Sequence, residues 1–169
     1  MVTDNTPVAK PPKAFSEVEI QDFICMVHAG GEVAEKYLER NVRNAECLVV
    51  VRQNSCLVGV AALKNPTSRH RRTIREKTGI AANARDLPFE LGYVFVLPSA
   101  RRQGIGLGLC ISVLSAADGR GVFATARTTN DGMLAMLPKL GFSDSGLPYQ
   151  SDRGRYKLQL FMRPGRILT

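Results

Sequence analysis

The apolar residues of this chain fall into short runs whose spacing alternates between helical and extended. Ser16 followed by Glu19 fits a capping box, in which each side chain satisfies the other residue's backbone N–H. The helix predicted from this point ends at Gly30-Gly31 and carries the apolar residues Val18, Phe23, Ile24 and Val27. A second helix is predicted from Glu32 to about Arg43, with Val33, Tyr37 and Leu38 facing inward.

Strands and helices alternate through the rest of the chain. The β-branched runs 47–52 and 56–63 flank the polar turn Gln53-Asn54-Ser55 and predict a hairpin. Residues 64–86 are polar and basic, and their length predicts a functional loop or lid with a short helix. Strands are then expected at 89–97, 122–127 and 156–162, and helices at 105–117 and 131–140. This order indicates an α/β fold with a mixed sheet.

Length and composition suit a single domain. Of the 169 residues 44% are apolar, which is enough for a buried core. Residues 1–14 contain three prolines and little to bury, so we expect a flexible N-terminal arm followed by one domain over 15–169. The N-terminus has no apolar signal-peptide region, and no run of 18 apolar residues exists to span a membrane.

The net charge and the cysteines indicate which ligands and which cellular compartment to expect. The formal charge of +8 and the sequence pI of about 9.7 favour polyanionic ligands such as nucleotide phosphates, nucleic acids or acidic protein surfaces. Four cysteines lie among apolar neighbours without a C-x-x-C pair, and neither His28 nor His70 stands at metal-ligand spacing from them. We therefore expect reduced thiols, a cytoplasmic location and no metal.

The stretch from Pro98 to Gly108, PSARRQGIGLG, has the features of an anion site. It joins the apolar strand FELGYVFVL to an apolar helix. Gly104 and Gly106 let backbone N–H groups turn toward a ligand without a side chain in the way. The helix N-terminus and the neighbouring Arg101 and Arg102 add positive charge, which suits a diphosphate.

Three nucleotide motifs contain glycines of this kind, and two fail here. A Walker P-loop needs Lys and Ser or Thr after the last glycine, but Leu109 and Cys110 follow Gly108. A dinucleotide motif needs Gly or Ala at position 109 and a first glycine directly after the strand, whereas Gly104 lies eight residues beyond Val96. A tight turn opening a buried helix remains the purely structural interpretation.

The third motif is that of the GNAT superfamily of N-acetyltransferases, Gln/Arg-x-x-Gly-x-Gly/Ala. Arg101 to Gly106 matches it without a gap, and Val96-Leu97-Pro98 resembles the end of the strand that precedes it in the family. The helix NDGMLAMLPKLGF, from Asn130 to Phe142, resembles the family's next motif, with Met133 in place of Ala and Leu137 in place of Tyr. The resemblance covers roughly residues 89–142 and implies a GNAT-like acyl-CoA N-acyltransferase fold, with a mixed central sheet and helices on both faces.

The resemblance also implies a cofactor and its contacts. Acetyl-CoA would be the cosubstrate, and its pantetheine arm and acetyl carbonyl would lie along the strand. The implied cofactor-binding residues are Val94, Phe95, Val96, Arg101, Arg102, Gln103, Gly104, Ile105, Gly106 and Asn130. Backbone groups of the strand would hold the oxyanion as the tetrahedral intermediate forms.

Glu90 is the candidate general base, acting directly or through water. It stands eleven residues before Arg101, the offset of the catalytic glutamate in the histone-acetylating branch of the family. Simple alternation places it on the face of Val94 and Val96, unless Gly92 introduces a bulge. A solvated or salt-bridged glutamate at a strand end is the structural alternative.

Leu137 cannot act as the general acid that a Tyr would supply in the family, so either no acid is used or another hydroxyl enters. Tyr149 and Tyr93 are the suggestions that the sequence offers, although packing roles suit both. His70 is a second candidate base.

The resemblance implies transfer of the acetyl group to an amine, and we expect this acceptor on a small molecule, a protein or an aminoacyl group. Residues 69–77 hold six basic side chains that could recruit an acidic acceptor or a nucleic acid, or form a solvated helix face. The alternative function is a basic nucleic-acid-binding module with a GNAT-like fold and weak or structural CoA binding. We expect no membrane association, and a monomer or a homodimer.

Overall fold

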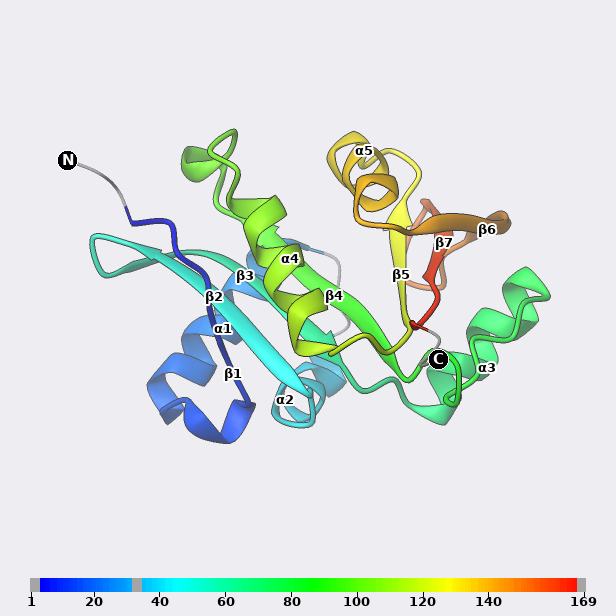
Figure 1. The fold of residues 1–169 in the computed structure, drawn as a ribbon, viewed down its shortest axis with the longest axis horizontal. Helices are drawn as coiled ribbons and strands as arrows, with labels where there is room; N and C mark the ends of the chain where they lie inside the picture. Colours follow the sequence, from blue (N-terminus) through cyan, green and yellow to red (C-terminus); the bar gives the residue numbers. More distant parts are fainter. Residues whose placement is uncertain (1–3, 32–34, 167–169) are drawn as a thin grey trace. The chain divides into compact units, whose positions relative to one another are not determined.

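The structure is a computed structural model that describes residues 4–31 and 35–166 (Figure 1). The chain divides into two compact units, which are described separately. The first comprises Met1–Lys64 and Leu91–Ala116, and the second Asn65–Glu90 and Ala117–Thr169. Strand β4 (Phe89–Val96) begins in the second unit and continues into the first.

The first unit is built on the strands β1-β2-β3-β4 in that order. β2 (Cys47–Gln53) and β3 (Cys56–Lys64) form the predicted antiparallel hairpin. Asn54 and Ser55 have left-handed φ values of 49° and 67°, the backbone of a tight two-residue hairpin turn.

The N-terminal segment differs from the flexible arm that the sequence suggested. β1 (Val8–Lys10) pairs antiparallel with β2, and Pro12–Ala14 forms a short 3-10 turn, η1. An edge strand of three residues is held by its backbone, so it needs no apolar pattern that a sequence could reveal.

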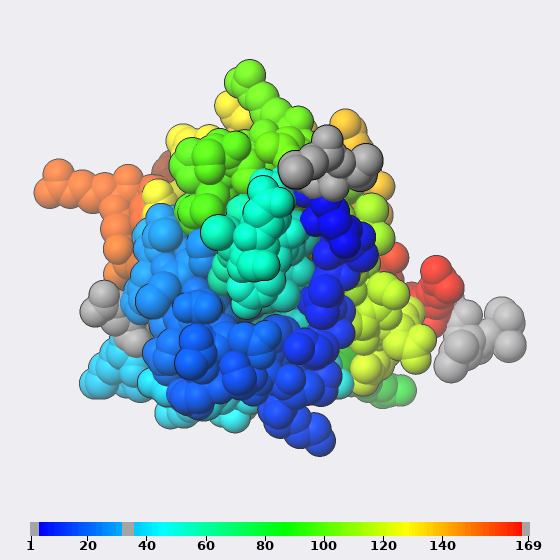
Figure 2. Space-filling view, turned by 90° about the vertical axis from the view of Figure 1, so that its left-hand side faces the viewer, coloured from blue at the N-terminus to red at the C-terminus, as the bar shows by residue number. Residues whose placement is uncertain are grey.

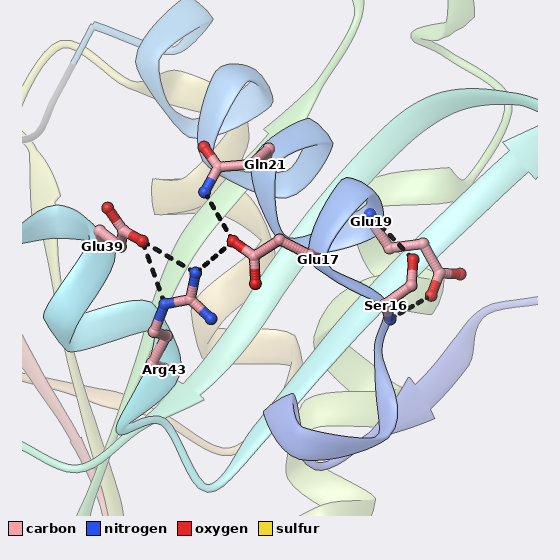
Figure 3. Close-up of polar contacts among 6 residues, drawn as sticks. All are labelled: Ser16, Glu17, Glu19, Gln21, Glu39 and Arg43. Carbon is pink, nitrogen blue, oxygen red and sulfur yellow. Dashed lines mark hydrogen bonds and ion pairs between the residues drawn. The ribbon is translucent and has the colours of Figure 1, made fainter.

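Helices α1 (Glu17–Ala29) and α2 (Glu35–Arg43) cover one face of this sheet. The capping box is present as predicted, with the Ser16 backbone N–H donating to Glu19 Oε2 at 2.8 Å and the Glu19 N–H to Ser16 Oγ at 3.2 Å (Figure 3). Arg43 of α2 reaches Glu17 of α1 and Glu39 of its own helix, which ties the two helices together (Figure 3).

One part of the second-helix prediction was wrong, and another cannot be assessed. Leu38 is buried as expected, but the Tyr37 side chain is exposed on the surface beside Lys36 and Arg40. Its aromatic ring stacks with these two cations instead of entering the core. The expected start of the helix, with Val33, lies outside the described residues.

Helix α4 (Ile105–Ala116) covers the opposite face of the first unit (Figure 1). Because side chains alternate along a strand, Leu48 and Val50 pack with α1 and α2, whereas Val49 and Val51 point to the other side. At Gly59 of β3, an added Cβ would lie 3.0 Å from both Ile105 and Leu109 of α4. The glycine therefore allows the helix to pack closely on the strand.

The second unit contains the strands β4-β5-β7-β6. β4 and β5 are parallel, and β5–β7 and β7–β6 are antiparallel, so the sheet is mixed. The predicted α/β class is confirmed. The remaining elements are α3 (Ser68–Thr78), β5 (Val122–Arg127), α5 (Asp131–Lys139), β6 (Ser143–Gln150) and β7 (Lys157–Arg163).

Two of these elements were incompletely predicted. β6 was missed because Ser143–Gln150 is a polar, largely exposed edge strand without apolar alternation. α3 is the short helix expected within residues 64–86; it starts at the N-cap Thr67 and ends at Gly79, whose φ of 72° is left-handed. It buries a single apolar residue, Ile74.

Candidate functional site

The turn between β4 and α4 in the first unit has the backbone geometry of an anion site. A 3-10 turn, η2 (Pro98–Ala100), follows the strand. Arg102 and Gly104 then adopt left-handed φ values of 62° and 76°. The helix starts at Ile105, and the Gly108 N–H donates to the Gly104 carbonyl at 3.0 Å. The N–H groups of the first helical turn have no intrahelical acceptor and are available to an anion.

Open space lies in front of both glycines of this turn. A Cβ added at Gly104 would meet no heavy atom within 4 Å, and one at Gly106 would meet only Val96 Cγ2 at 3.9 Å. This contrasts with Gly59, where protein atoms already occupy the corresponding space. A side chain at either position would extend into open space beside the turn, so glycine leaves the backbone of the turn open to a group such as the pyrophosphate of a CoA ester.

The polar side chains of the turn have different tasks. Arg101 Nε–H donates to the Val96 carbonyl at 3.0 Å, so it clasps the end of β4. The Gln53 amide donates to Gln103 at 2.8 Å and to Asn5 at 2.6 Å, and Figure 2 shows these three segments side by side at the surface. Arg102 is exposed, so its guanidinium is accessible to a bound anion.

Strand β4 changes its alternation before it reaches the turn. Tyr93 has a left-handed φ of 56°, next to the glycine at which the sequence suggested a bulge. Tyr93 and Phe95 pack against the cluster of α1 and α2, and Val96 approaches Gly106. The simple alternation from Glu90 to Val94 therefore does not hold along this strand. Phe95 can offer a ligand only its backbone groups.

Glu90 lies in the second unit, at the start of β4, where it pairs with Phe123 of β5. Its side chain is only 5% exposed. His70 of α3 places Nε2 at 3.1 Å from Glu90 Oε2. This is ion-pair distance, but Nε2 is buried and makes no hydrogen bond of acceptable direction within the described part of the chain. The His70 ring also packs on Phe123, with centroids 6.2 Å apart.

Arg71, the next residue of α3, is a structural clamp. Its guanidinium donates to the carbonyls of Ala82, Leu87 and Pro88 at 2.6, 2.9 and 2.9 Å. Desolvation lowers the pKa of Arg71, and the negative charge of Glu90 opposes this effect. The clamp fixes the segment that leads directly into β4 and so holds the backbone that carries Glu90.

Tyr149 of β6 is the tyrosine associated with Glu90. Burial, followed by the nearby charge of Glu90, raises the pKa of Tyr149 to about 12, so its phenol is neutral at ordinary pH. Leu137 is fully buried and belongs to the core. Tyr93, the other tyrosine considered, packs edge-on against Phe23 in the first unit.

Asn130 is the N-cap of α5, where its Oδ1 accepts from the Met133 N–H at 3.2 Å. This bond uses one of the two lone pairs of the side-chain oxygen. The amide NH₂ group can donate to a ligand.

The six basic residues at 69–77 do not form one uniform surface. His70 and Arg71 point inward, and Lys77 contacts Asp152 and the Gln150 carbonyl. The exposed remainder is Arg69, Arg72 and Arg75. Among residues 4–31 and 35–166, no three acidic, histidine or cysteine side chains are grouped as metal ligands. No helix in the same ranges is long and apolar enough to cross a membrane.

Comparison with known proteins gives a family match and several similar folds. The profile of the Acetyltransferase (GNAT) family matches residues 14–142. An acyl-CoA N-acyltransferase from Pseudomonas aeruginosa is 17% identical, with a TM-score of 0.64 over 95% of this chain and 99% of the other. A ribosomal-protein-alanine N-acetyltransferase from Brucella melitensis is 17% identical, with a TM-score of 0.63 over 93% and 99% of the two chains.

An N-acetyltransferase from Staphylococcus aureus gives a TM-score of 0.64 at 14% identity, covering 94% of this chain and 98% of the other. At these identities the similarity establishes the fold. No curated protein sequence matches this chain significantly. None of the similarities supports the nucleic-acid-binding alternative.

Proposed function

Since the chain belongs to the acetyltransferase (GNAT) family, we propose that it transfers an acetyl group from acetyl-CoA to an amine within a ternary complex. The observation that carries this proposal is the turn before α4. Its two glycines border open space, and its backbone is left-handed at Arg102 and Gly104. Backbone N–H groups and a neighbouring arginine provide the positive potential that a pyrophosphate needs.

The proposed cofactor contacts follow from this geometry. The N–H groups from Gln103 to Gly106 hold the pyrophosphate, and the exposed Arg102 adds a full charge. Arg101 acts indirectly, because its Nε–H is bonded to the end of β4. Backbone groups of Val94, Phe95 and Val96 bind the pantetheine and acetyl carbonyl. Asn130, in the second unit, stays a cofactor contact that the family resemblance implies.

Glu90 is the proposed general base. An ammonium has no lone pair, so the acceptor must lose a proton before or during attack. The amine nitrogen then bonds to the acetyl carbonyl carbon, the carbon–sulfur bond breaks, and coenzyme A leaves as a thiolate. A thiol has a pKa near 8.5, so this leaving group departs without a proton donor. The reaction therefore does not require the tyrosine that Leu137 replaces.

The acceptor is proposed only by class, as an amine on a small molecule, a protein or an aminoacyl group. The exposed Arg69, Arg72 and Arg75 of α3 favour an acceptor that also carries negative charge. Acceptor selection in such folds depends on loops and not on the fold itself.

Calorimetric titration tests the cofactor part of the proposal. The protein should bind acetyl-CoA, and Arg102→Gln should weaken binding by about tenfold, the loss expected for one charge-assisted phosphate contact. Arg85→Gln, which removes an exposed arginine in the second unit, is the matched control and should bind normally. Binding of RNA in place of acetyl-CoA would favour the alternative function.

Coenzyme A release from an acceptor panel tests the chemistry. Glu90→Gln should depress turnover chiefly below the pKa of the acceptor amine, where deprotonation is needed, while acetyl-CoA affinity stays unchanged. An identical pH–rate profile would remove Glu90 from the role of base.

A further inference from the structure

The buried pair of His70 and Glu90 has features that neither a solvated glutamate nor a surface histidine would show. The 3.1 Å contact joins Nε2, which is buried, to Oε2 of a carboxylate that is 5% exposed. Both residues lie in the second unit, and Phe123 packs against the imidazole. The pair is thus held by packing, and the contact is not an adjustable surface ion pair.

Solvent access differs between the two partners. The His70 side chain is 26% exposed although its Nε2 is buried, so the exposed surface lies on other atoms of the side chain. A base that takes a proton in every turnover must lose it again. The buried carboxylate is poorly placed to give its proton to bulk water, whereas the His70 side chain contacts the carboxylate and is also partly exposed.

Charged and titratable groups of α3 and β6 also act near the carboxylate. Arg71 on α3 carries a fixed positive charge committed to three carbonyl groups. Tyr149 on β6 remains neutral, and Asp152 and Arg153, which follow that strand, act on its phenol with opposite signs. Neither Arg71 nor Tyr149 changes its charge near neutral pH.

We propose that His70 is a proton-relay residue that carries the acceptor's proton from Glu90 to solvent, an inference that rests on the proposed acetyl transfer. Glu90 takes the proton from the amine. Its O–H bond then breaks as the N–H bond forms at His70 Nε2, and the imidazolium releases a proton to water from Nδ1. A turn of the imidazole ring then presents its unprotonated nitrogen to Glu90 again, so both groups return to their starting charges and protonation sites, and no further reactant is consumed.

Histidine resonances test the coupling independently of activity. The chain contains two histidines, so His28→Gln leaves the imidazole signals of His70 alone in the NMR spectrum. The signals of this variant and of His28→Gln with Glu90→Gln are followed against pH. We expect the midpoint to move to lower pH when the carboxylate is neutralised, because a neighbouring anion favours the imidazolium. An unchanged midpoint would overturn the relay.

Turnover supplies the second test. His70→Gln should lower kcat by about tenfold or more, within the range for one acid–base group, with an unchanged KM for acetyl-CoA. Added imidazole should restore part of the rate, which a purely structural defect would not allow. His70→Asn is measured in parallel in case the first variant folds poorly. Glu76→Gln, an exposed change on the same helix, is the control.

The outcomes distinguish a failure of the proton relay from a failure of the proposed acetyl transfer. Normal kcat in both His70 variants across the pH range would overturn the relay and leave acetyl transfer standing. A wild-type protein that released no coenzyme A with any acceptor would overturn acetyl transfer, and the relay with it.

Discussion

Gly106→Ala should make the free protein more stable and its acetyl-CoA complex less stable. Gly106 is the second residue of α4, and its φ lies outside the left-handed region. An added methyl would contact only Val96 Cγ2, at an ordinary 3.9 Å. Alanine is favoured over glycine within a helix by up to about 1 kcal/mol. For a chain of this size that corresponds to a rise in Tm of roughly 2–4 °C.

The same methyl would occupy the space proposed for the pyrophosphate. At a ligand concentration 100 times Kd, acetyl-CoA should stabilise the wild-type protein by about 2.7 kcal/mol. If the methyl weakens binding at least tenfold, the same concentration stabilises the variant by about 1.4 kcal/mol or less. The two proteins should therefore exchange rank in a thermal melt when the ligand is added.

Thermal unfolding with and without acetyl-CoA measures both effects in one experiment. Gly132→Ala is the matched control, because Gly132 is the second residue of α5 and its added Cβ would meet only Asn130 Oδ1 at 3.7 Å. That variant should gain stability and keep the full ligand shift. A lower Tm for free Gly106→Ala would refute the claim that a methyl group has room at position 106. An undiminished Tm shift on addition of acetyl-CoA would refute the claim that the cofactor occupies that room.

Three further predictions concern stability and titration. Ser16→Ala removes half of the capping box and should cost about 1 kcal/mol in urea unfolding, with acetyl-CoA affinity unaffected. Burial raises the pKa of Cys110 to about 12, so an aromatic disulfide reagent should modify the exposed Cys25 and Cys56 rapidly and Cys110 only after unfolding. The raised pKa of Tyr149 means that the folded state holds the phenol proton more tightly than the unfolded state does. The stability that this proton contributes is complete below pH 10 and is lost between about pH 10 and 12. Urea unfolding measured across alkaline pH should show this loss of stability in the wild-type protein and not in Tyr149→Phe.

The parts of the fold that sequence reasoning predicted are those determined by local chemistry. The capping box, the hairpin turn at Asn54-Ser55 and the glycine-rich turn each depend on residues within a few positions of one another. Strands β1 and β6 were not recognised, since both are edge strands paired through their backbones. Neither needs an apolar face.

The candidate site divides in the same way. The turn before α4 is a contiguous motif whose glycine at position 104 has a left-handed φ, and its role in cofactor binding stays a prediction. The pairing of His70 with Glu90 joins positions twenty residues apart, across a segment that resembles a basic surface loop. The sequence indicated each residue as a candidate base, but no spacing rule connects a helix to a strand over such a distance.

The charge of a segment is a poor guide to the charge of its surface, and α3 shows why. Six basic residues lie between positions 69 and 77, and three of them make contacts within the protein. Arg71 donates to three backbone carbonyls, His70 contacts a buried carboxylate, and Lys77 forms an ion pair with Asp152. Arg71 and His70 are committed to contacts within the second unit, and the charge of the exposed Lys77 is offset by Asp152. Attraction of an acidic acceptor to this helix would come chiefly from the exposed Arg69, Arg72 and Arg75, a set of charges suited to one or two negative groups and not to an extended backbone.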